Sequence, residues 1–166
     1  MNGEPEAAPI ASPSGRRRRA AARLAAVQAL YQMDVAAKGL NEVFAEFETH
    51  WMGREVEGVE YEQADVDFFR RIITGVLADQ VALDRAADNL LADGWPLKRI
   101  EAVMRAVFRA AAHELKQRKD IPARVVITEY VDVAAAFLAK DEVGMVNAVL
   151  DKLAREFRAS EFDQAV

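Results

Sequence analysis

The stretch Ile100–Leu115, IEAVMRAVFRAAAHEL, contains the clearest helical pattern in the chain. Its apolar residues recur at intervals of three and four positions, which predicts a helix with one broad buried side. These residues are Ile100, Val103, Met104, Val107, Phe108, Ala111, Ala112 and Leu115. The small alanines at 110–112 allow neighbouring helices to approach closely. We therefore expect a central helix around which the others pack, with packing rather than chemistry as its main role.

The same kind of spacing predicts further helices on both sides of this stretch. They are expected at about 17–37, 41–52, 63–78, 83–91 and 123–139, and Asp141 is expected to cap a last helix that follows it. No segment has the alternation of a convincing β-strand, and GREVEGVEYE at 53–62 is predicted to be a polar loop. The predicted fold class is all-α, with about seven helices.

Composition predicts one helical domain behind a short N-terminal tail. Residues 1–15 contain three prolines, two glycines and no apolar period, so they are predicted to be disordered. Residues 16–166 suit a single domain, with subdomains at roughly 16–92 and 95–160. The hydrophobic content of 52% is sufficient for a substantial core, and much of it is alanine, which favours helix.

The residue types present exclude several kinds of chemistry. The chain has no cysteine, only two histidines (His50 and His113), and serines only at Ser12, Ser14 and Ser160. Thiolate or histidine metal clusters and a serine-based triad are therefore not expected. No glycine-rich phosphate loop occurs, and no run reaches the ~18 apolar residues that a membrane span requires. We expect a cytoplasmic protein that is not an enzyme, with no catalytic residue, metal, cofactor or membrane partner.

The net charge of −5 conceals a basic segment near the N-terminus. Residues 1–30 contain five arginines, Arg16–Arg19 and Arg23, against two glutamates. Positive charge at the start of a helix opposes the helix dipole, so helix stability does not explain these arginines. Guanidinium groups bind phosphates and stack on bases. The run indicates either a nucleic-acid contact or a solvated charged segment.

Two glutamates lie among apolar residues: Glu114 near the end of the central stretch, and Glu129 among Val126, Ile127, Tyr130 and Val131. Burying a lone charge is costly, so a buried glutamate needs a partner. Glu114 is expected either to reach a backbone N–H or an arginine of a neighbouring helix, or to be exposed. Glu129 is expected to be a structural acid or a binding residue.

Five segments, taken in order, resemble successive signatures of the NusB family of bacterial transcription antitermination factors. They are RRRRAAARLAAVQALYQ, FFRRIITGV, MRAVFRAAAHEL, DIPARVVITEYVDVA and VNAVLDK, and they extend from about Arg18 to Lys152. The resemblance implies two three-helix bundles packed across each other. It also implies a non-catalytic protein that binds boxA RNA with the ribosomal protein NusE. RNA polymerase and other Nus factors are the further partners it implies, notably on ribosomal RNA operons.

The resemblance and the arginine run together give the expected site residues. The expected RNA-binding residues are Arg16, Arg17, Arg18, Arg19, Arg23, Gln28, Asp141 and Asn147. The expected partner-binding residues are Tyr31 and Glu114. Gly144 and Met145 stand where the family commonly has a basic residue and an aromatic one, and a stacking aromatic contributes about 1–3 kcal/mol per base. Either RNA affinity is lower, or Arg16–Arg19 compensate, or a different boxA is read.

Two other functions stay open at this point. The same helical domain occurs at the N-terminus of some rRNA cytosine methyltransferases, where it resembles an RNA-positioning module. The end of this chain at Val166 leaves no room for a cofactor-binding domain, which argues against methyl transfer. A purely protein-binding helical homodimer is the other alternative, because some family members self-associate.

Overall fold

The computed structural model describes residues 13–50, 55–56, 59–60, 65–91, 96 and 100–163. Its helices are α1 (Pro13–Ala36), α2 (Leu40–His50), α3 (Val66–Asp88), α4 (Ala102–Gln117), α5 (Ala123–Ala135), α6 (Lys140–Phe157) and α7 (Ala159–Phe162). Two short strands, β1 (Glu55–Val56) and β2 (Val59–Glu60), pair antiparallel. The predicted all-α class with about seven helices is confirmed.

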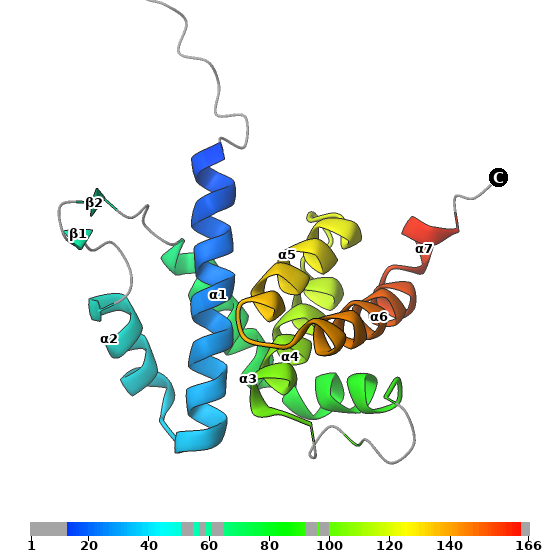
Figure 1. The fold of residues 1–166 in the computed structure, drawn as a ribbon, viewed down its shortest axis with the longest axis horizontal. Coiled ribbons are helices and arrows are strands. Elements are labelled where there is room, and N and C mark those ends of the chain that lie inside the picture. The colour runs from blue at the N-terminus through cyan, green and yellow to red at the C-terminus, as the bar shows by residue number, and fades with distance from the viewer. Residues whose placement is uncertain are drawn as a thin grey trace, which may run out of the picture.

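The helices form two groups of three that meet at α4 (Figure 1). Helices α1–α3 make the first group and α4–α6 the second, and α1 stands between α2 and the second group. Helix α4 packs against α1 and α3 on one side and against α5 and α6 on the other. Its residues Ala110–Leu115 are consequently all buried. The predicted central helix and the two crossed bundles are both confirmed.

Helix α3 is one helix where the sequence predicts two. The apolar pattern weakens around 79–82, but this stretch contains neither glycine nor proline to end a helix. The chain instead continues through a kink at Asp79, whose φ is −130° and ψ is 16°. Lys116 of α4 donates a hydrogen bond of 2.6 Å to the Asp79 carboxylate at this point. The kinked helix thus stays attached to α4.

Several other boundaries differ from those predicted. Helix α1 begins at Pro13, a residue suited to a first turn, so the last residues of the predicted tail are helical and residues 1–12 lie outside the described part. The predicted loop at 53–62 contains β1 and β2. Asp141 does not cap α6, because the helix already begins at Lys140 and Glu142 accepts the N–H of Ala139 at 3.2 Å. Helix α7 was not predicted.

Candidate functional site

A groove between the start of α1 and the start of α5 collects several of the expected arginines. We call it the arginine groove, and its lining residues are Arg16, Arg19, Arg23, Asp120, Ile121, Pro122, Arg124, Val125, Thr128 and Glu129. Arg16, Arg19 and Arg124 are exposed. Within the described residues, none of these three forms an ion pair with a carboxylate. Three guanidinium groups are therefore available to an anion here.

The two acids of the arginine groove each lie near an arginine side chain. Arg118 donates hydrogen bonds of 3.0 and 2.9 Å to the two oxygens of Asp120. These bonds lower the pKa of the Asp120 carboxyl to about 2. The Glu129 carboxylate lies 3.9 Å from the guanidinium group of Arg23. The lining contains four arginines against these two acids, so the groove retains a positive character.

Arg23 lines this groove but is almost wholly buried, in an ion pair with Glu114. Its side chain is 3% exposed, and it donates hydrogen bonds of 2.9–3.2 Å to both oxygens of Glu114. Glu114 is 0% exposed and also accepts a hydrogen bond from the Tyr130 hydroxyl. Burial alone would lower the pKa of Arg23, but the hydrogen bonds and charge of Glu114 outweigh it and raise that pKa. Burial, reinforced by the charge of Glu114, raises the pKa of Tyr130.

This pair corrects two expected roles. Arg23 was expected to contact RNA and Glu114 to contact a partner, yet both side chains are buried against each other. Neither is placed for a direct contact with another molecule. The alternative in which Glu114 reaches an arginine of a neighbouring helix is confirmed.

A cluster of arginine side chains around the Phe68 ring connects the elements that form the arginine groove. The guanidinium groups of Arg19, Arg23 and Arg118 lie over the Phe68 ring, with 5.7, 4.9 and 5.2 Å to its centroid. Such contacts are favourable because the ring face carries negative charge density. The N–H of Asp65 also donates to the carbonyl oxygen of Arg18 at 3.1 Å. The start of α1 is thereby fixed to the start of α3 and to the loop after α4.

A second groove lies further along α1, and we call it the aromatic groove. Its lining residues are Gln28, Tyr31, Gln32, Val35, Glu101, Ala102, Val103 and Phe137. Tyr31, Val35 and Phe137 are 37%, 58% and 41% exposed, which is unusual for apolar side chains gathered at one place. Gln28 and Tyr31, which the sequence singles out together, thus share one surface.

A third groove has an apolar floor and an acidic rim, and we call it the acidic-rimmed groove. Its lining residues are Leu90, Leu91, Ile100, Glu101, Met104, Asp141, Glu142, Met145, Ala148, Val149 and Lys152. Glu101 lines this groove as well as the aromatic groove, so the two are adjacent. Asp141 lies on its rim, whereas Asn147 is exposed on α6 outside its lining.

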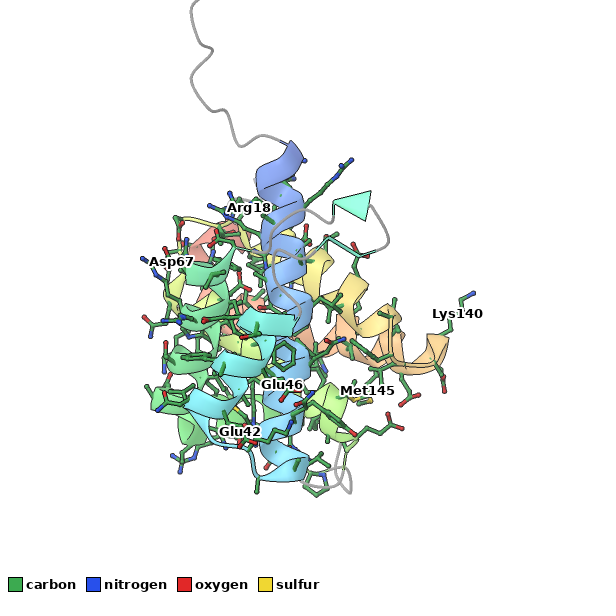
Figure 2. All side chains as sticks on the ribbon, turned by 90° about the vertical axis from the view of Figure 1, so that its left-hand side faces the viewer. Arg18, Glu42, Glu46, Asp67, Lys140 and Met145 are labelled. Atoms are coloured by element: carbon green, nitrogen blue, oxygen red, sulfur yellow. The ribbon has the colours of Figure 1, made fainter. Side chains whose placement is uncertain are left out.

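The expected RNA-binding residues are therefore divided among separate surfaces. Figure 2 shows Arg18 near the N-terminal end of α1, far from Lys140 and Met145 at the start of α6. Arg17 and Arg18 are exposed but do not line the arginine groove. The sequence interpretation missed Arg124 and Phe137. Arg124 follows the loop motif DIPA directly, and that position was the only signal for it.

The described residues offer neither a metal site nor a membrane span. Across the described ranges, no group of three or more His, Cys, Asp or Glu side chains is arranged to hold a metal ion. None of the helices, as far as the structure describes them, is long and apolar enough to cross a bilayer.

Comparisons with known proteins identify the relatives of this chain. A model of the NusB family matches residues 20–155. The transcription antitermination protein NusB of Rhodopseudomonas palustris (strain HaA2) is 65% identical over 145 residues, covering 87% of this chain and 86% of that protein. The structure of T. maritima NusB has a TM-score of 0.70 at 29% identity, covering 89% of this chain and 96% of that one.

A further solved structure shares the fold. It is a chain from the crystal structure of antitermination factors NusB and NusE in complex with dsRNA. Its TM-score is 0.70 at 20% identity, and the match covers 84% of this chain and 98% of that one. At this identity the likeness concerns the fold alone.

Proposed function

The chain belongs to the NusB family of transcription antitermination proteins, and we propose that it binds boxA RNA together with the ribosomal protein NusE. In this proposal the bound pair joins RNA polymerase and other Nus factors in the cytoplasm. It suppresses termination there, notably on ribosomal RNA operons. The chain acts by binding, without a catalytic residue, metal or cofactor.

The observation that carries the proposal is the arginine groove. Arg16, Arg19 and Arg124 approach it from two helices, and Asp120, one of its two acids, is already paired with Arg118. Arginine stays charged at all relevant pH values and binds phosphate oxygens through its planar fork. If each of the three engages one phosphate of single-stranded RNA, log affinity should fall with log salt at a slope of about −2. Arg17 and Arg18, on other sides of α1, would add weaker attraction.

The aromatic groove is the proposed contact for NusE. Exposed tyrosine and phenylalanine side chains supply large apolar area at little entropic cost, and aromatic residues are enriched in protein interfaces. Tyr31 and Phe137 provide this area, beside the carboxylate of Glu101. The adjacent rim adds Glu142 to Glu101, and these acids suit a basic ribosomal protein.

Base recognition is proposed for Gln28, Asp141 and Asn147. Their amide and carboxylate groups can exchange hydrogen bonds with base edges. Met145 lines the acidic-rimmed groove where the family commonly has an aromatic residue, so stacking there is weaker than in a family member with a ring. We therefore expect the arginine groove to supply a larger share of the RNA affinity in this chain.

Gel mobility of a boxA RNA tests this proposal. The RNA is mixed with this chain alone, with NusE alone, and with both, at several salt concentrations. Cooperative retention by the pair is expected. The variant Arg16→Ala/Arg19→Ala/Arg124→Ala should lose at least about tenfold in affinity and most of the salt slope. Arg85→Ala, which removes an exposed arginine of α3, is the matched control and should bind normally.

The gel-mobility experiment and two further measurements separate the proposal from its rivals. If the pair ignores boxA RNA even at low salt, RNA recognition by this chain is wrong. Light scattering then shows whether the chain forms a homodimer that RNA does not alter. Measurable methyl transfer to rRNA would instead favour the enzyme class.

A further inference from the structure

We propose that Arg158 and Glu161, near the C-terminal end, hold the loop between α4 and α5 in the position that the arginine groove requires. This inference rests on the proposed RNA-binding function of that groove. It makes both residues positioning residues, which act through the loop and not by touching RNA. Both lie outside residues 20–155, the part that the family model matches.

Arg158 connects the end of α4 to the following loop. Its side chain is 2% exposed, although it carries a charge. It donates hydrogen bonds to the carbonyl oxygens of Glu114 at 3.2 Å and Leu115 at 2.5 Å. It also donates to those of Arg118 at 2.7 Å and Ile121 at 2.9 Å. The last carbonyls of a helix lack partners within the helix and attract a cation, and this guanidinium group bonds the Leu115 carbonyl and shares that of Glu114 with the N–H of Arg118.

Glu161 links Arg158 to the start of α5. One of its carboxylate oxygens accepts a hydrogen bond of 2.5 Å from Arg158. The other accepts the N–H of Ala123, the first residue of α5, at 2.9 Å. Pro122, which precedes the helix, provides no side-chain cap, so Glu161 takes that role. The bond from Ala123, followed by the bond and charge of Arg158, outweighs burial and lowers the pKa of Glu161.

The loop held in this way is a wall of the arginine groove. Asp120, Ile121 and Pro122 line the groove, and the carbonyl oxygen of Ile121 is one of the four that Arg158 binds. Arg124 lies in the first turn of α5, directly after the residue that Glu161 caps. A displaced loop would therefore move Arg124 relative to Arg16 and Arg19. In this proposal the spacing of the three guanidinium groups depends on Arg158 and Glu161, which lie more than 30 residues after Arg124 in the chain.

The test uses conservative variants of the full chain with matched controls. Arg158→Lys keeps the charge but cannot reach four carbonyls, and its control is Arg85→Lys, at an exposed arginine of α3 that does not line the arginine groove. Glu161→Ala removes the link to Ala123, and its control is the exposed Glu156→Ala. Since Glu161 is itself exposed, its variant should fold even where Arg158→Lys does not. Binding of boxA RNA in the presence of NusE is measured across salt, well below each unfolding midpoint.

Both test variants should lose about three- to tenfold in RNA affinity, with a shallower salt slope. Hydrogen exchange should be faster at 118–125 and unchanged in α2, and both controls should match the wild type. If affinity and slope stay at wild-type values while only the melting temperature falls, the residues are merely structural and the inference is wrong. A wild-type chain that does not bind the RNA with NusE overturns the proposed function first, and this inference with it.

Discussion

Arg23 of α1 and Glu114 of α4, which are 91 residues apart in sequence, form a bidentate ion pair inside the core. Removing one partner leaves the other charge buried without compensation, which costs about 3–5 kcal/mol. We predict that Glu114→Ala lowers the free energy of unfolding by about this amount, because Arg23 and the Tyr130 hydroxyl both lose their acceptor. Urea unfolding followed by circular dichroism measures the change.

The triple variant Arg23→Met/Glu114→Leu/Tyr130→Phe provides the contrast. It removes the three buried polar groups together, and Glu129, which loses Arg23 as a neighbour, is partly exposed to solvent, so the variant should be clearly more stable than Glu114→Ala. Equal instability of the two variants would show that lost packing, and not an uncompensated charge, is the cause.

This pair also shows what the sequence could and could not predict. The apolar period around Glu114 indicated that a buried acid would need a partner, and periodicity likewise predicted the central helix. The identity of the partner depends on how α1 crosses α4, which no local pattern encodes. The sequence pattern predicted two helices in place of the single α3. An apolar period indicates which residues are buried, and it fails where a helix is exposed on several sides, as α3 is around Leu77 and Val81. Arg124 and Phe137 were missed because a groove is formed by residues far apart in the chain.

Gly75 on α3 gives a second prediction. A Cβ atom added at Gly75 would lie 2.0 Å from Cε1 of His113, so the histidine ring would have to move. Helix propensity alone predicts that alanine stabilises the helix by about 1 kcal/mol, but the overlap should outweigh it and destabilise the protein by about 1–3 kcal/mol. Gly144→Ala on α6 is the control, since nothing lies within 4 Å of the added atom, and it should stabilise the protein. Thermal unfolding of both variants, showing opposite signs, is the measurement.

A double variant tests the cause of that loss. If the contact with His113 is responsible, the losses of Gly75→Ala and His113→Ala should not add, and the combined variant should lose less than their sum. If the losses in stability of the two single variants add, the destabilisation of Gly75→Ala does not come from the contact with His113.

His113 itself makes stability depend on pH. Burial lowers the pKa of His113, and nearby Arg118 lowers it further, although Glu114 and Asp79 oppose them. The unfolded chain, in which the pKa is about 6.5, therefore binds a proton at a higher pH than the folded chain does. The free energy of unfolding should fall as pH drops below about 6.5 and level off below the folded-state pKa. Urea unfolding between pH 8 and pH 5 measures this slope.

Histidine variants identify the group responsible. His113→Gln should flatten the slope over this range, whereas His50→Gln, at the only other histidine, should keep it. Asp120 and Glu161 do not interfere, because their lowered pKa values place their titration at lower pH. An unchanged slope in the His113 variant would assign the pH dependence to other groups.

The aromatic groove gives the last prediction, which concerns the protein partner. Tyr31 and Phe137 are 37% and 41% exposed, so each ring has an open part that a covering partner would bury. Tyr31→Ala and Phe137→Ala should each weaken NusE binding by about 1–2 kcal/mol or more when binding is measured well below the melting temperature of each variant, which falls because the packed part of the ring is also lost. Val81→Ala, at a 74% exposed position on α3, is the control and should leave NusE binding unchanged. Calorimetric titration with NusE measures the affinities without RNA. Wild-type affinity in both ring variants would mean that NusE docks on another surface, and the acidic rim around Asp141 and Glu142 would be the next to test.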